Sequence, residues 1–202
     1  MSGPRANALG QPIGPPLTGW KQPARPPRTV MEGRYVRIEP VHERFAAELH
    51  DANVQDADGR MWTYLPYGPF DSEPAYHAWM STTCFGADPM FHVIVDRESD
   101  RAVGVAAYMR IAPESGCIEV GHVCYSPRLQ RGRGATEAMY LMMRRAFGLG
   151  YRRYEWRSVV PRPAAPPATE CDLSVLRTSR ATLFKAADQS LTTRHDGDAA
   201  RW

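Results

Sequence analysis

The chain contains 202 residues, of which 43% are hydrophobic and 23% charged, and its formal net charge at pH 7 is +3. These proportions are ordinary for one globular domain, and so small a net charge gives no reason to expect a nucleic-acid partner. No run of about 18 apolar residues could cross a membrane, and the N-terminus lacks the apolar segment of a secretory signal. The four cysteines lack the CxxC spacing of a zinc site. We therefore expect a cytoplasmic protein with no metal and no membrane partner.

Composition divides the chain into three parts. Residues 1–32 are rich in proline, which fixes φ and removes a backbone donor, so we expect an extended leader that lies on the surface or is disordered. Residues 33–157 alternate strand-like and helix-like patterns and form the expected domain. Residues 158–202 open with "SVVPRPAAPPATE" and have weak periodicity, so we expect a divergent, poorly ordered tail.

Apolar periodicity in the middle part predicts eight elements, in this order: strand 34–41, helix 42–54, helix 72–83, strand 90–97, strand 101–111, strand 116–126, helix 136–149 and strand 151–160. Ser72 is the expected N-cap of the second helix, and Pro74 fits its first turn. The first two of the three consecutive strands are separated by the turn residues "ESD", which predicts a hairpin. This order is typical of a mixed α/β layer architecture.

The last expected helix follows a basic, glycine-containing loop. Its apolar face is formed by five residues: Met139, Met142, Met143, Ala146 and Phe147. Its N-terminus points back at "QRGRGAT", where unsatisfied N–H groups and the positive end of the helix dipole attract an anion. Gly132 and Gly134 let the backbone approach a ligand, and Arg131 and Arg133 add charge. The loop therefore predicts a phosphate site, with a basic turn of solvated arginines as the alternative.

The succession "GCIEVGHVCYSPRLQRGRGATEAMYLMMRRAF", preceded by "DRAVGVAAYMRI", resembles the core of the GNAT superfamily of N-acetyltransferases. It is most similar to the branch of Rim-type ribosomal-protein N-terminal acetyltransferases; "NALGQPIG", "WTYLPYGPF" and "YRRYEWR" also resemble uncharacterised bacterial members of that branch. The resemblance implies a mixed α/β fold with a mostly antiparallel sheet flanked by helices. It also implies acetyl transfer from acetyl-CoA, the acetyl-donor substrate, to a primary amine on a protein N-terminus or a small molecule.

The resemblance further assigns residues to the acetyl donor. Its thioester arm is implied to lie beside Val123, Cys124 and Tyr125. Its pyrophosphate is implied to bind the loop made of Gln130, Arg131, Gly132, Arg133, Gly134, Ala135 and Thr136. The family pattern has glycine where this chain has Arg133, so the amide donors are kept only if Arg133 adopts the required φ, which a left-handed geometry would disfavour.

Two polar residues of strand 116–126 are the catalytic candidates, because deprotonating an amine near neutral pH needs a general base. Glu119 is either that base or a solvated or ion-paired strand residue, and His122 is either the base or a packed, hydrogen-bonded histidine. Strand alternation is expected to send their side chains to opposite faces. A backbone N–H near Val123 or Cys124 would stabilise the developing oxyanion, whereas nothing nearby marks Cys124 as an activated nucleophile.

An aromatic loop precedes the second helix and contains Trp62, Tyr64, Tyr67 and Phe70. In the family this region lines the acceptor pocket, which makes Tyr64 and Tyr67 the candidate acceptor-binding residues. The alternative is a hydrophobic plug between helices. The acceptor itself stays open among an N-terminal amine, a free amino acid and a small polyamine, and a homodimer also stays open.

The resemblance ends after residue 157. Family members continue with an Asn-x-x-Ser helix, a Gly-Phe pair and a closing hairpin; the helix signature and the Gly-Phe pair are missing here, and "PRPAAPP" forbids a regular helix. We expect a sheet that is incomplete in its C-terminal part, with strand 151–160 as an exposed edge, and a frameshift would explain the abrupt change. Two alternatives to an active enzyme follow: a catalytically impaired GNAT remnant, and a non-enzymatic module that binds CoA or phosphate.

Overall fold

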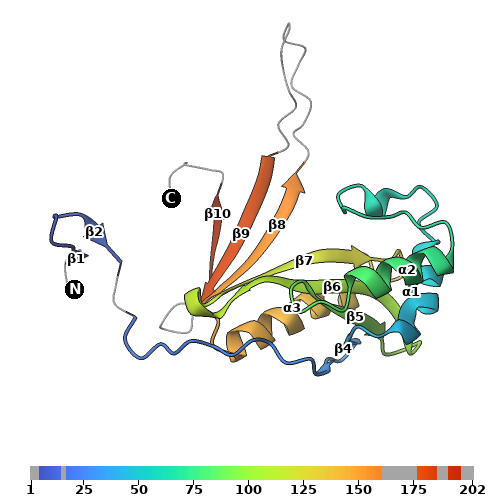
Figure 1. Ribbon diagram of the computed structural model, residues 1–202, viewed down its shortest axis with the longest axis horizontal. Coiled ribbons are helices and arrows are strands. Elements are labelled where there is room, and N and C mark those ends of the chain that lie inside the picture. The colour runs from blue at the N-terminus through green and yellow to red at the C-terminus, as the bar shows by residue number, and fades with distance from the viewer. Residues whose placement is uncertain (1–4, 15–16, 161–176, 186–190, 197–202) are drawn as a thin grey trace, which may run out of the picture.

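The computed structural model describes residues 5–14, 17–160, 177–185 and 191–196. Its main sheet has eight strands in the order β10-β9-β8-β7-β6-β5-β4-β3 (Figure 1). The strands are β3 (Met31–Glu32), β4 (Val36–Pro40), β5 (Met90–Asp96), β6 (Arg101–Ala112), β7 (Cys117–Tyr125), β8 (Arg153–Val160), β9 (Arg177–Lys185) and β10 (Leu191–Asp196). All neighbours pair antiparallel except β7 and β8, which are parallel. The expected mixed α/β fold with a mostly antiparallel sheet is confirmed.

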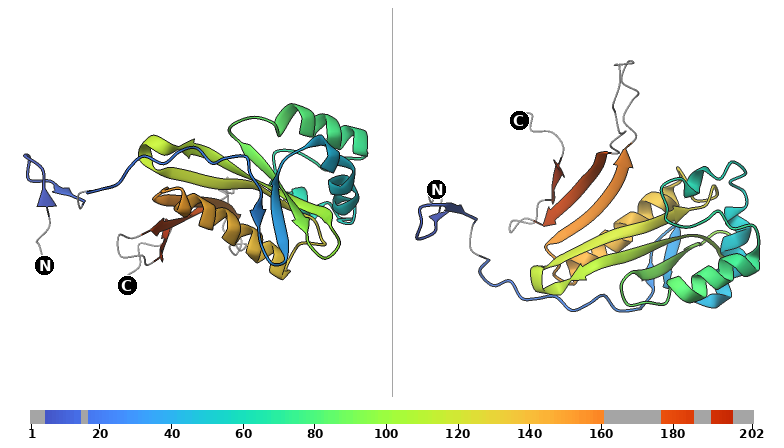
Figure 2. Two further views of the ribbon diagram at one scale, coloured as in Figure 1. Left: turned by 90° about the horizontal axis from the view of Figure 1, so that it is seen from below. Right: turned by 45° about the horizontal axis from the view of Figure 1, so that its top comes forward.

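Among the described residues, three α-helices cover the two faces of the sheet. They are α1 (Ala46–Asn53), α2 (Glu73–Thr83) and α3 (Arg133–Gly148). Figure 2 shows α3 on one side of the central strands and α1 with α2 on the other. A separate hydrophobic cluster fills each interface, one under α3 and one under α1 and α2. These two sides are called the α3 face and the α1/α2 face below.

The expected elements are found where the apolar periodicity placed them, within a few residues at their ends. Ser72 caps α2 as expected, because its hydroxyl oxygen accepts a hydrogen bond from the Ala75 N–H at 3.4 Å. The buried stripe of α3 differs from the expected one, since it consists of Ala138, Leu141, Met142 and Ala146. Small alanines let the helix approach the sheet closely, and the larger Met139, Met143 and Phe147 pack at the margins. No helix in the described ranges has the length and apolar character needed to cross a bilayer.

The proline-rich leader runs extended along the domain after a small β1–β2 hairpin (Arg5–Ala6 and Pro12–Ile13) (Figure 1). The Trp20 indole donates to the Gly150 carbonyl at 3.2 Å. Arg145 of α3 donates to the carbonyls of Thr29 and Val30 at 2.6 and 2.7 Å. Because these bonds join side chains to backbone carbonyls, they hold the extended segment between β2 and β3, which pairs with no strand in the described ranges.

The end of the sheet differs from the expectation. We expected β8 to be an exposed edge, and this is wrong for the described residues, because β9 pairs antiparallel along β8 from Arg153–Phe184 to Val160–Arg177. β9 therefore pairs with the edge of β8 that the sequence resemblance left unpaired. Residues 161–176, 186–190 and 197–202 lie outside the described ranges, and with them most of the expected irregular tail. The frameshift remains a prediction.

Candidate functional site

A β-bulge interrupts β7 in its second half. Val105 of β6 pairs with Cys124, but Ala107 pairs with Gly121, so two residues of β7 stand opposite one residue of β6. One of these two is His122, whose φ of 48° is left-handed. An extra residue with such a φ locally bends the strand and re-aims the side chains that follow it.

The bulge brings the two catalytic candidates to one face. Before it, Ile118 and Val120 point into the α3-face cluster, so Glu119 between them points to the α1/α2 face. At the bulge the His122 ring lies 4.9 Å from the ring of Phe91, which belongs to the α1/α2-face cluster. The expectation of opposite faces is therefore wrong, because strand alternation holds only while the pairing register is unbroken.

The second half of β7 also parts from β8. The parallel ladder joins Cys117–Val120 to residues 153–156 and ends there, although β7 continues to Tyr125 and β8 to Val160. Figure 1 shows the two strands diverging beyond that point. The backbone N–H and C=O groups of residues 121–125 that face β8 therefore take no part in the β7–β8 ladder. Such an edge can form hydrogen bonds with an amide-containing ligand laid along it.

The loop after β7 leads to a helix start without a side-chain cap. Gly132 is the N-cap of α3, with φ −96° and ψ 165°, and no side chain caps the first turn. Arg133 is the first residue of the helix, so the left-handed geometry that would disfavour it does not arise there; the left-handed residue of the loop is Arg131, with φ 58°. The uncapped N–H groups and the exposed arginines together favour binding of an anion.

Gly134 has a packing role beside any role in binding. A Cβ at this position would lie 2.9 Å from Val36 Cγ1 and 3.2 Å from Leu129 Cδ1, so glycine lets the first turn of α3 rest on β4. Glu137 fixes the same turn, because its carboxylate accepts hydrogen bonds from three consecutive backbone N–H groups at 2.6–2.9 Å, those of residues 34–36. Burial raises the pKa of Glu137, but these three donors outweigh burial and lower it. Sequence reasoning missed this anchor, since nothing in the motif links Glu137 to β4.

Glu119 is a buried, ion-paired carboxylate. Its side chain is 4% exposed, and its Oε1 and Oε2 lie 2.6 Å from Arg110 Nη1 and 3.4 Å from Arg157 Nε. Arg110 donates a hydrogen bond to Oε1, whereas Oε2 lies beside Arg157 without a hydrogen-bond partner among the described residues. This is the ion-paired alternative weighed for Glu119 from the sequence.

His122 has a different environment. Its ring stacks on Tyr67 at 5.7 Å with an interplanar angle of 14°. Its Nδ1 is buried and has no hydrogen-bond partner among the residues that the structure describes. Burial, and then the positive charge of Arg110, lower the pKa of His122. The imidazole is therefore neutral near pH 7 and able to accept a proton.

The aromatic loop packs partly into the core, and its acceptor-binding role stays a prediction. Tyr67 packs against His122 and also against Trp79, at 4.3 Å between ring centroids. Trp62 is buried in the α1/α2-face cluster, which is the plug expected as the alternative. Tyr64 is 56% exposed, so it lies on the surface of this loop. Cys124 is also buried in the cluster, and burial raises the pKa of its thiol well above the ordinary range, which leaves it protonated and a poor nucleophile.

Comparison with known proteins decides the family. A model of the acetyltransferase (GNAT) family matches residues 53–168. The chain belongs to the GNAT acetyltransferases. A GCN5-related N-acetyltransferase from Brucella melitensis is 35% identical, with a TM-score of 0.68 over 71% of this chain and 66% of the other. A probable GNAT-family acetyltransferase from Chromobacterium violaceum is 38% identical, with a TM-score of 0.67 over 78% of this chain and 77% of the other.

More distant GNAT structures show only the shared fold. A structure from Vibrio cholerae, assigned by name to the ribosomal-protein-serine acetyltransferases, is 17% identical with a TM-score of 0.51, over 63% of this chain and 72% of the other. A search of the curated proteins found no match. In the described part of the chain, no group of three or more His, Cys, Asp or Glu residues could hold a metal ion.

The GNAT donor, acetyl-CoA, can be tested against the residues present. Its pantetheine arm carries amides that match the β7 edge at residues 121–125, which is free of the β7–β8 ladder. Its pyrophosphate is an anion that matches the uncapped start of α3 and the adjoining arginines. The free β7 edge and the start of α3 are joined by a short loop. Gln130 Nε2 donates to the Tyr125 carbonyl at 2.7 Å and holds this loop against the end of β7. The residues fit the donor.

Proposed function

We propose that this GNAT protein transfers the acetyl group of acetyl-CoA to a primary amine. The observation that carries the proposal is the combination of a bulged strand half, which leaves the ladder with β8, and an uncapped helix start directly after it. The first suits the amides of the donor and the second suits its phosphates. A strand paired on both edges would leave no backbone groups for the donor's amides. A helix start with a side-chain cap would leave fewer N–H groups for its phosphates.

The donor-binding residues follow from this arrangement. The backbone of Val123, Cys124 and Tyr125 lies along the thioester arm. The first N–H groups of α3, in the loop from Gln130 to Thr136, bind the pyrophosphate. Arg131 and Arg133 are exposed and add positive charge there. The donor supplies an activated acetyl group, and the protein's part is to orient it and to stabilise charge.

His122 is the general base in this proposal, and Glu119 is not. The attacking amine must lose a proton as its nitrogen forms the new bond to the acetyl carbon, while the donor's thiolate leaves. His122 faces the aromatic loop and its Nδ1 has no partner among the described residues, whereas Glu119 is ion-paired with two arginines, with a hydrogen bond from Arg110 at Oε1 and none at Oε2. A backbone N–H of Val123 or Cys124 stabilises the developing oxyanion.

The acceptor is a primary amine, either on a protein N-terminus or on a small molecule, with Tyr64 and Tyr67 as the residues that contact it. The sequence motifs support membership of the Rim-type branch, in which the acceptor is a ribosomal protein. The likeness to the Vibrio cholerae structure supports the fold alone, because the identity is 17%. A cytoplasmic location and a homodimer are part of the same proposal.

Thiol release from acetyl-CoA, measured with a panel of amines and N-terminal peptides, tests the proposal. We expect amine-dependent release and a thermal shift that acetyl-CoA gives and ADP alone gives more weakly. A thermal shift with no release on any amine would instead support a non-enzymatic CoA-binding module or an impaired remnant. No shift and no release would contradict the proposed function.

A further inference from the structure

A second bulge interrupts the sheet, this time in β6. The register of β6 against β7 shifts between Met109 and Ala112. Within this shift two residues of β6, Arg110 and Ile111, stand opposite one residue of β7. Arg110 has a φ of 46°, a left-handed value that is unfavourable for an arginine. Such a backbone persists only where neighbouring groups hold it in place.

Asp88, in the loop between α2 and β5, holds the β6 bulge. Its Oδ1 accepts a hydrogen bond from the Arg110 N–H and its Oδ2 one from the Ile111 N–H, each at 2.9 Å. The leader braces the same place, because Arg25 donates to the carbonyls of Ala87 and Ile111 at 3.0 and 3.4 Å. Arg25 Nη2 also lies 3.8 Å from Asp88 Oδ2. One carboxylate that accepts two successive backbone donors fixes the direction of both peptide groups.

The side chain of Arg110 links the β6 bulge to the catalytic face of β7. Its Nη1 donates to Glu119 Oε1 at 2.6 Å, and Glu119 lies on the same face of the sheet as His122. After burial, the positive charge of Arg110 is the second cause that lowers the pKa of His122. The backbone geometry at Arg110 therefore decides where a positive charge stands relative to the proposed base.

We propose that Asp88 is a positioning residue for the acetyl transfer, which holds the β6 bulge so that Arg110 keeps its guanidinium beside Glu119 and His122. Asp88 acts through Arg110 and not by contact with a reactant. The inference rests on the proposed function, in which His122 is the base. It also gives the leader a part in the site, because Arg25 braces the loop that carries Asp88.

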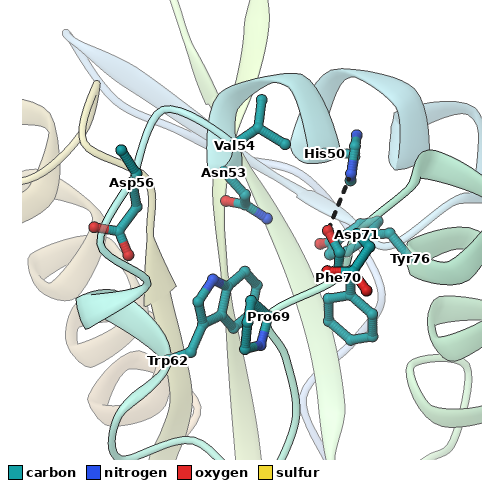
Figure 3. A pocket seen from close by; sticks show the side chains of 10 residues that line it. His50, Asn53, Val54, Asp56, Trp62, Pro69, Phe70, Asp71 and Tyr76 are labelled. Atoms are coloured by element: carbon teal, nitrogen blue, oxygen red, sulfur yellow. Dashed lines mark hydrogen bonds between the residues drawn. The ribbon is translucent and has the colours of Figure 1, made fainter.

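The other titratable groups around His122 stay the same in the variants described below. Burial raises the pKa values of Tyr67 and Cys124, so both side chains stay neutral. Phe91, which β5 contributes beside His122, carries no charge. The remaining carboxylates are Glu119 on β7 and, at the hollow that the aromatic loop lines beside α1, Asp56 and Asp71 (Figure 3).

An NMR titration of the His122 ring tests the inference without donor or acceptor. The chain has six histidines, and the signal that His122→Gln removes is that of His122. Asp88→Asn puts an amide NH₂ in place of one oxygen, so the side chain can no longer accept from both N–H groups. We expect the pKa of His122 to rise by about 0.3–0.5 unit, because a partly exposed charge moves away from it.

The sign of this shift separates positioning from a direct effect of charge. Loss of the negative charge of Asp88 would by itself lower the pKa of His122, since it removes a group that favours the imidazolium. A rise therefore reports the displacement of Arg110. Arg110→Gln should give a larger rise, because it removes the guanidinium altogether. In that background Asp88→Asn should give no further rise.

The matched control is Asp100→Asn. Asp100 is also a carboxylate paired with an arginine, Arg37, but it is 76% exposed and lies in the turn between β5 and β6. We expect no rise in the pKa of His122 there. In steady-state assays of Asp88→Asn, the inflection of kcat/KM should move up with the titration, and the KM for acetyl-CoA should stay unchanged.

The side chain of Asp88 is 34% exposed, so we expect its variant to fold, which circular dichroism checks. An unchanged or lowered pKa of His122 in Asp88→Asn would overturn the inference, and so would an equal rise in the Arg110→Gln background. Because the titration needs no turnover, its failure beside normal thiol release would leave the proposed function standing. Absence of thiol release from the unaltered protein would contradict the proposed function, whatever the titration shows.

Discussion

The two halves of β7 belong to one strand but differ in their backbone pairing. In the first half, Cys117–Val120 all pair with β8, and Cys117, Glu119 and Val120 pair with β6 across a register shift. In the second half, a bulge interrupts the pairing with β6, and the ladder with β8 has ended. β7 thus passes from a half that pairs with β8 to a half whose β8-side edge a ligand can use, with Gly121 at the boundary.

The polar side chains of the two halves also differ in how many partners they have. Glu119, in the first half, has arginines at both carboxylate oxygens. His122, in the second half, has a buried ring nitrogen without a partner among the described residues. A polar residue on this strand can be held by ion pairs, as Glu119 is, and we propose His122 as the group available for chemistry.

The largest expected effect separates these two residues in activity. His122→Gln removes the general base and should lower kcat by about 10²-fold or more, with little change in the affinity for acetyl-CoA. Glu119→Gln should lower kcat by less than about 5-fold, because its carboxylate is already neutralised by ion pairs. Steady-state rates of thiol release measure both. A larger loss in Glu119→Gln than in His122→Gln would reverse the assignment.

The next effect concerns the helix start that follows the open half. Arg133→Pro removes one N–H donor at the first position of α3, where proline is well tolerated, and Gly132 before it is already extended. We expect acetyl-CoA to bind about tenfold more weakly, roughly 1.4 kcal/mol, which is the scale of a charge-assisted hydrogen bond.

The matched control for this change is Arg133→Ala, which removes the same side chain and its contact with the Tyr35 ring but keeps the N–H. Calorimetric titration of both variants with acetyl-CoA separates the donor from the charge. Equal weakening in the two variants would mean that the side chain of Arg133, and not the backbone of the loop, holds the ligand.

A smaller effect tests the structural role of Glu119. Glu119→Gln leaves Arg110 and Arg157 without their carboxylate and should lower the free energy of unfolding by about 1 kcal/mol, at the low end for an ion pair because both arginines are partly exposed. Urea denaturation measures this loss. Glu114→Gln is the control, since Glu114 is exposed and has no ion pair in the described ranges. Equal stabilities of the two variants would contradict a structural role for Glu119.

The smallest effect is a shift in pH dependence. Burial and the charge of Arg110 lower the pKa of His122, so the base is lost only when the pH falls through this lowered value. The rate kcat/KM should therefore rise with pH and level off below the ordinary histidine range. Arg110→Gln removes a positive charge that opposes protonation, so the inflection should move to higher pH. An inflection that moves to lower pH, or stays in place, would place the base elsewhere.

Much of the fold was readable from the sequence because periodicity reports burial. The buried run of β5 and the amphipathic α3 gave strong patterns, and the loop before α3 lay where glycine and arginine indicated a turn into a helix. The bulge at His122 could not be predicted, because a left-handed histidine leaves no mark in composition. Without the bulge, strand alternation placed Glu119 and His122 on opposite faces of the sheet, whereas the structure has them on one face. The pairing of Glu119 with Arg157 was also hidden, since it depends on β8 lying parallel to β7, far along the chain. Similarly, β9 covers β8 although the sequence after residue 157 lacks the expected pattern.

The central claim is that acetyl-CoA binds along the open half of β7 and at the start of α3. The most direct measurement is the amide ¹H–¹⁵N spectrum of the protein, recorded with and without acetyl-CoA and combined with amide hydrogen exchange. The account predicts large shifts and slower exchange for the amides of residues 121–125 and 131–136, with small changes for Cys117–Val120, which the β7–β8 ladder already pairs. Unchanged amides in both of the first two segments at saturating acetyl-CoA would contradict it.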